Sequence, residues 1–71
     1  MGVLTMNIEI ERETDGRWIA EVPDLPGVMS YGKSREEAIT KVEALALRVL
    51  ADRLDHGEEI PEINNVFAIP A

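Results

Sequence analysis

Residues 23–43 read PDLPGVMSYGKSREEAITKVE, and they contain the turn, the hinge and the helix start around which the rest of the chain is arranged. The prolines at 23 and 26 each fix a backbone φ angle, and Gly27 then allows the chain to reverse direction. Leu25, between the prolines, is expected to fold back beneath a sheet. We therefore expect a rigid turn, a short strand over residues 28–31, and a change of direction at Gly32.

Ser34 and Glu37 have the spacing of a capping box, which marks the start of a helix. The serine oxygen can accept from the third helical amide, and the glutamate can reach back to the serine amide. We expect the helix to run from Arg35 to about Asp55, with Gly57 in the left-handed position beyond its end. Its apolar stripe is centred on Val42, with Leu50 at the margin, and also includes Ala38, Ile39, Leu45, Ala46 and Val49.

The remaining segments predict strands. Alternating apolar residues from Leu4 to Ile10 indicate a first strand, and Asp15-Gly16 indicates a hairpin turn into a second strand over residues 17–22. Residues 66–69 are expected to form a last short strand. The predicted order is β-β-β-α-β in one domain spanning residues 1–71. This is an α+β fold, with a small, mainly antiparallel sheet and one long helix packed on one face.

Charge and size limit the classes of partner. The 71 residues include 14 acidic and 7 basic side chains, a formal net charge of −7, and no cysteine. Such a surface repels phosphate and attracts basic proteins, so we expect no direct binding of nucleic acid. A chain this short buries little surface alone, which favours a homo-oligomer. No apolar run is long enough to cross a membrane and no signal segment is evident, so we expect a cytoplasmic protein.

No catalytic, metal or cofactor site is predicted. Acidic residues on the hairpin have ordinary explanations as the solvated face of a strand or as turn residues. His56 is the only histidine, and its place at the helix end suits interaction with the negative helix terminus. One enzymatic alternative stays open: a residual metal-dependent nuclease that uses Glu21 and Asp24.

Several large apolar residues exceed what one helix and a small sheet can bury. They either wrap around the core or form an interface with a partner or another copy, and an oligomeric scaffold that binds a small ligand is a further alternative. The candidate interface residues are Trp18, Ile19, Tyr31, Leu47, Leu54 and Phe67.

Two blocks, WIAEVPDLPG at residues 18–27 and YGKSREEA at residues 31–38, resemble the signature of the HicB antitoxin family, and Pro61 also fits its pattern. The resemblance covers nearly the whole chain. The signature loop and helix start comprise Pro23, Asp24, Leu25, Pro26, Gly27, Gly32, Ser34, Glu37 and Ala38.

The resemblance implies a partly degraded ribonuclease-H-like domain without its catalytic acids. It also implies the antitoxin of a type II toxin–antitoxin pair, which binds and masks a small basic ribonuclease toxin of the HicA type. Family members that repress their own operon carry a DNA-binding segment after this domain. This sequence stops at Ala71, so operator binding is not expected.

Overall fold

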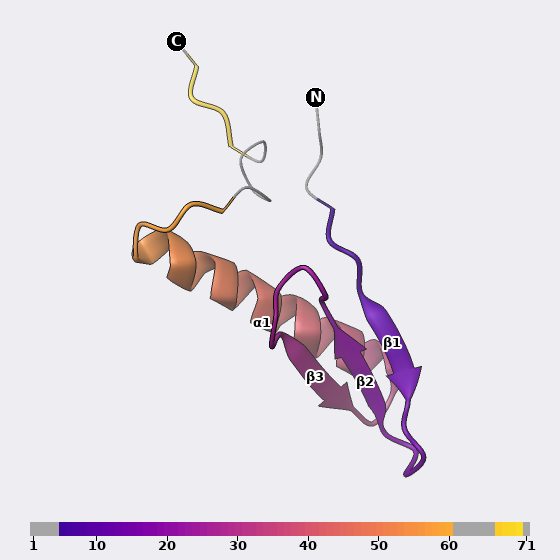
Figure 1. Ribbon diagram of the computed structural model, residues 1–71. Coiled ribbons are helices and arrows are strands. Elements are labelled where there is room, and N and C mark those ends of the chain that lie inside the picture. The colour runs from indigo at the N-terminus through magenta and orange to yellow at the C-terminus, as the bar shows by residue number, and fades with distance from the viewer. Residues whose placement is uncertain (1–4, 61–66, 71) are drawn as a thin grey trace.

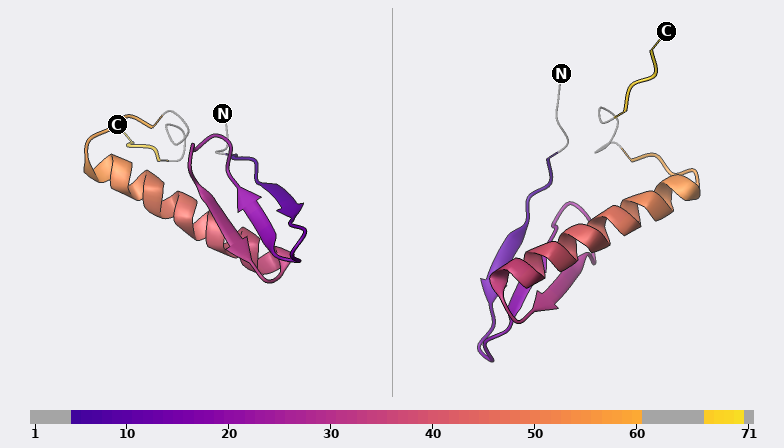
Figure 2. Two further views of the ribbon diagram at one scale, coloured as in Figure 1. Left: turned by 60° about the horizontal axis from the view of Figure 1, so that its bottom comes forward. Right: turned by 180° about the vertical axis from the view of Figure 1, so that it is seen from behind.

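The computed structural model describes residues 5–60 and 67–70. Three strands are followed by one long helix: β1 (Glu9–Arg12), β2 (Trp18–Glu21), β3 (Met29–Gly32) and α1 (Arg35–Asp55). The strands form an antiparallel sheet in the order β1-β2-β3. The helix crosses one face of this sheet and packs on β2 and β3, as Figures 1 and 2 show. The predicted α+β class is confirmed.

The turns form where the sequence predicts them. In the hairpin between β1 and β2, Gly16 has a φ of 91°, and its N–H donates to the Glu13 carbonyl at 3.0 Å. In the turn after β2, Leu25 is fully buried, and Gly27 adopts a φ of 85°. Val28 N–H donates to the Leu25 carbonyl at 3.0 Å and closes this turn. The two-proline segment therefore inserts an apolar side chain beneath the sheet.

The first strand begins later than predicted. It starts at Glu9, whereas residues 5–8 are outside the ladder and Leu4 lies outside the described residues. The register that pairs Glu9 with Glu21 would place residue 7 opposite Pro23, which has no N–H to donate. The ladder therefore ends where β2 ends.

The helix begins and ends at the predicted residues. Ser34 Oγ accepts from Glu37 N–H at 3.1 Å, whereas Glu37 Oε1 accepts from the amide of Lys33 at 2.9 Å rather than from that of Ser34. The capping carboxylate thus reaches one residue further back than predicted. Glu37 also pairs with Lys41 Nζ at 3.5 Å, and Gly57 takes a φ of 75° after the helix.

The core lies between the sheet and α1. Its helical members are Ala38, Val42, Ala46 and Leu50, each four residues after the last. Leu50 is only 5% exposed, so its predicted place at the margin of the stripe is wrong. The buried row extends to Leu50, which belongs to the same buried cluster as Ile60, a residue that follows the helix and is 3% exposed. The full set of buried residues is Ala20, Val22, Leu25, Val28, Ala38, Val42, Ala46, Leu50 and Ile60.

The predicted last strand is not formed in the part of it that the structure describes. Residues 67–70 have no strand pairing and run away from the sheet (Figures 1 and 2), whereas residue 66 lies outside the described residues. A strand needs a neighbour to supply its hydrogen bonds, and β1 and β3 contact this segment at neither edge of the described sheet.

The sheet and the helix pack closely at Gly32. A Cβ atom built on Gly32 would overlap the Ala38 backbone nitrogen and lie 2.9 Å from the Ala38 Cα. Backbone atoms cannot move aside as a flexible side chain can. Only glycine therefore lets the end of β3 meet the first turn of α1.

Gly32→Ala should lower the free energy of unfolding by about 3 kcal/mol, because the methyl group forces β3 and α1 apart. Gly57→Ala is the control, since its Cβ would meet nothing within 4 Å and only the positive φ is strained. We expect the control to lose about 1 kcal/mol. Urea denaturation of both variants measures this, and equal losses would show that crowding at Gly32 is unimportant.

Glu37 should make the fold sensitive to acid. The hydrogen bond from Lys33 N–H, and secondarily the Lys41 charge, hold the pKa of Glu37 below its ordinary value of 4.5. Since the folded-state pKa is the lower one, the stabilisation is present above the ordinary pKa and is lost as pH falls through the folded-state pKa.

The stability advantage of the natural chain over Glu37→Gln should therefore shrink as pH falls from about 6 to about 3. Thermal unfolding across this range measures it. Glu36→Gln controls for removal of a negative charge from the first helical turn. A difference between Glu37→Gln and the natural chain that is constant with pH would contradict the assignment.

Candidate protein-binding face

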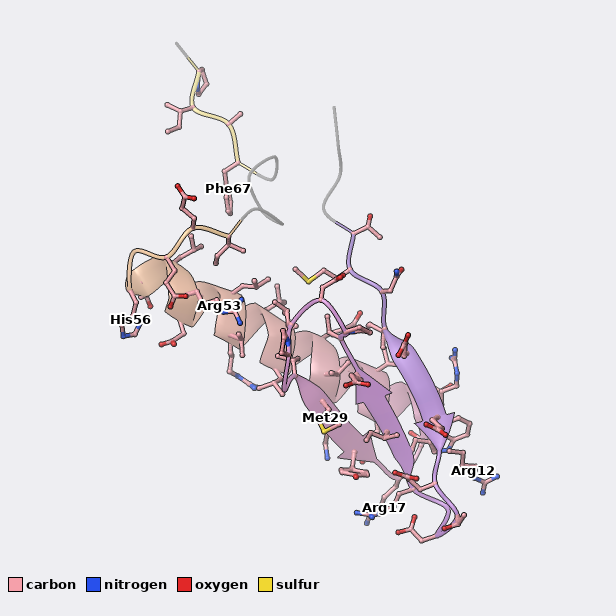
Figure 3. All side chains as sticks on the ribbon, viewed as in Figure 1. Arg12, Arg17, Met29, Arg53, His56 and Phe67 are labelled. Carbon is pink, nitrogen blue, oxygen red and sulfur yellow. The ribbon has the colours of Figure 1, made fainter. Side chains whose placement is uncertain are left out.

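The sheet face opposite α1 carries no covering element among the described residues. We call it the open face, and it consists of Glu9, Glu11, Ile19, Glu21, Met29 and Tyr31. Strand alternation places these residues there, because their neighbours Ala20 and Val22 are buried against the helix. In Figure 3, Met29 projects from β3 on the side of the sheet away from α1.

The register brings side chains from all three strands into two rows. Glu9 pairs with Glu21, which pairs with Met29, and Glu11 pairs with Ile19, which pairs with Tyr31. Directly opposite residues in an antiparallel sheet have neighbouring side chains on one face. Apolar side chains on β2 and β3 therefore lie beside carboxylates on β1 and β2.

All of these residues except Tyr31 line a shallow depression of about 460 Å³. Its lining includes Glu9, Glu11, Glu21 and Glu13, together with Ile19 and Met29. Met29 and Tyr31 are each 42% exposed, which is high for large apolar side chains. The face thus carries carboxylates on β1 and β2 beside apolar side chains on β2 and β3.

Tyr31 is held at the edge of the open face by an arginine. The Arg17 guanidinium lies 4.4 Å from the centre of the Tyr31 ring, a cation–π distance, and Arg17 Nε donates to Asp15 Oδ2 at 2.7 Å. The backbone hydrogen bond from Arg17 N–H, and then the guanidinium, lower the pKa of Asp15. The hairpin turn therefore orients an aromatic side chain that the sequence marked as a candidate.

The six candidate interface residues do not form one surface. Ile19 and Tyr31 are directly opposite each other on the open face. Trp18 packs against the core on the other face, with the Arg12 guanidinium 5.8 Å from its ring. The other three lie elsewhere. Leu47 and Leu54, on the helix, are 66% and 48% exposed, and Phe67, in the C-terminal segment, is 75% exposed.

Sequence reasoning missed Met29 and did not join the glutamates of β1 and β2 into one surface. Alternation along the first strand predicts that Glu9 and Glu11 share its solvated face. Alternation along the second strand predicts that Ile19 and Glu21 share one face, but it does not say that the two faces are the same. The missing information was the register between strands, which the hairpin loop of residues 13–17 sets.

Several of the signature residues stabilise the fold. Leu25 fills the core, Gly32 permits the contact with Ala38, and Ser34 and Glu37 cap the helix. These four residues therefore have structural roles, whereas Pro23, Asp24 and Pro26 are exposed in the turn after β2.

The catalytic candidates also have structural surroundings. His56 Nδ1 lies 2.8 Å from the Asp52 carbonyl oxygen at the end of α1. Over residues 5–60 and 67–70, no three His, Cys, Asp or Glu side chains are grouped so that they could hold a metal ion. No helix in the same residues is long and apolar enough to span a membrane.

Comparison with known proteins identifies the family of the chain. Residues 6–70 match the family described as "HicB_like antitoxin of bacterial toxin-antitoxin system". UPF0150 protein Ta0767 of Thermoplasma acidophilum is 31% identical over 55 residues, covering 78% of this chain and 80% of that protein. No solved structure matches the chain. The resemblance noted in the two sequence blocks is confirmed: the chain belongs to the HicB-like antitoxin family of bacterial toxin–antitoxin systems.

Proposed function

We propose that this chain is a non-catalytic antitoxin that binds and masks a small, basic, HicA-like ribonuclease toxin in the cytoplasm. The open face is the surface that engages the toxin. The observation that carries the proposal is the combination of carboxylates and exposed apolar side chains on a sheet face with no cover among the described residues.

The charge of this face suits a protein that binds RNA. A ribonuclease must present cations to the phosphates of its substrate. Carboxylates from Glu9, Glu11 and Glu21 can occupy those cations and so compete with RNA. The overall charge of −7 attracts the same partner over longer distances and speeds encounter.

The apolar side chains of the open face suit a lasting complex rather than charge attraction alone. Protein interfaces are enriched in aromatic residues and methionine. Tyr31, Met29 and Ile19 supply side chains of this kind on β2 and β3. Arg17 limits the freedom of the Tyr31 ring before binding, which reduces the entropy lost on association.

Two carboxylates of the open face also oppose folding of the free chain. Glu9 and Glu21 are directly opposite each other, and like charges in such pairs are destabilising. A cationic partner would remove this repulsion, which supports a binding role for the pair.

The free chain should gain stability when this repulsion is removed. Glu9→Gln should raise the free energy of unfolding by about 0.2–1 kcal/mol at neutral pH and low salt. The gain should shrink as salt screens the charges. Glu58→Gln, in the loop after the helix, is the control and should change little. Thermal melts at low and high salt measure both, and an equal gain in the two variants would contradict a local cause.

Toxin neutralisation tests the function itself. The chain is co-expressed with each small basic protein encoded beside it, and growth and complex formation are recorded. We expect one such protein to arrest growth alone and to form a stable complex with this chain. If none does, the antitoxin role fails.

The Glu9→Lys/Glu21→Lys variant then tests the surface. It should lose about 100-fold in affinity and fail to rescue growth. Glu58→Lys/Glu59→Lys is the matched control, since each exchange adds two charges and both variants move from −7 to −3. Equal binding by the two variants would show that the toxin uses another face.

A further inference from the structure

A second apolar depression lies between the chain leading into β1 and the middle of α1. We call it the flank groove, and its volume is about 210 Å³. One carboxylate, Glu43, lies among its lining residues, and the others are apolar: Met6, Ile8, Val22, Ala46, Leu47 and Leu50. Leu47 is 66% exposed, so the groove is open to a partner.

The C-terminal segment has the complementary character. Phe67 is 75% exposed and Ile69 is 96% exposed, although both are large and apolar. They occupy alternate positions, so in an extended chain both side chains point to the same side. Figures 1 and 3 show residues 67–70, with Phe67 labelled, running away from the three strands. We call this segment the tail.

The position of the groove fits an extended segment. Met6 and Ile8 immediately precede β1, which is an edge strand of the described sheet. An edge strand offers backbone donors and acceptors to an added strand. A tail laid beside β1 could therefore gain backbone hydrogen bonds while its alternate side chains enter the groove.

We propose that two copies of this chain exchange tails, so that Phe67 and Ile69 of each copy fill the flank groove of the other. Each copy carries one donor segment and one acceptor groove. Reciprocal exchange therefore closes with twofold symmetry and leaves no groove empty. Within one chain the tail runs away from the sheet (Figure 1), and none of its residues lines the groove. A chain of 71 residues gains much from extra apolar burial.

The exchanged dimer remains compatible with partner binding. The flank groove lies beside α1, and the open face is on the opposite side of the sheet. Two copies joined through their tails would present two separate open faces. The exchange is therefore independent of the proposed antitoxin function, and either can fail without the other.

Light scattering after size-exclusion chromatography gives the first test. The full chain should have twice the 7.9 kDa mass of one copy across a dilution series. Phe67→Ser/Ile69→Ser and Leu47→Glu should each have the mass of one copy, with circular dichroism unchanged. Leu54→Glu is the matched control, because Leu54 is exposed on the same helix but outside the groove, and it should stay dimeric.

Mixing the variants separates exchange from other modes of association. Leu47→Glu retains its tail but has a blocked groove, whereas Phe67→Ser/Ile69→Ser retains its groove but has an impaired tail. Mixed together, they should form a one-to-one heterodimer through a single tail and groove. A full chain of single mass, a dimer that survives the tail substitutions, or a mixture that stays monomeric would each overturn the proposal.

Discussion

The contact between Gly32 and the Ala38 backbone is the constraint on which the rest of this structure depends. It brings the end of β3 against the first turn of α1, where the Ser34 and Glu37 hydrogen bonds start the helix. From that point a 21-residue helix crosses the sheet, and its row of Ala38, Val42, Ala46 and Leu50 closes the core. The small side chains at 38 and 46 keep the layers close. Larger side chains at positions 38 and 46 would push the helix away from β2.

A single helix on a three-stranded sheet leaves one sheet face without a cover in the described structure. The residues that stabilise the fold and the residues proposed to bind a partner therefore lie in different places. The residues that identify the family lie in turns, caps and the core. The residues proposed to contact a toxin project from the opposite face. Substitutions on that face can alter partner choice with little effect on the core. Related domains can therefore share a signature and bind different partners.

The distribution of charge follows the same division. No charged side chain is buried among the described residues, and the helix start is satisfied by local hydrogen bonds. Like charges instead lie directly opposite each other on the open face, where Glu9 pairs with Glu21. Under the proposed function, a cationic partner would relieve the repulsion of this pair. A binding surface that is optimal for the complex need not be optimal for the free chain.

The sequence by itself determined the family, the α+β class, both turns and the helix from Arg35 to Asp55, because these features depend on hydrogen bonds and φ angles within a few residues. Only the tertiary structure decided which residues share a face. It joined Glu9, Glu21 and Met29 on one face, buried Leu50 in the same core cluster as Ile60, and left residues 67–70 outside the sheet. Strand register, helix crossing and strand pairing are set by contacts between distant segments. A short pattern specifies a strand's alternation but cannot specify its neighbour.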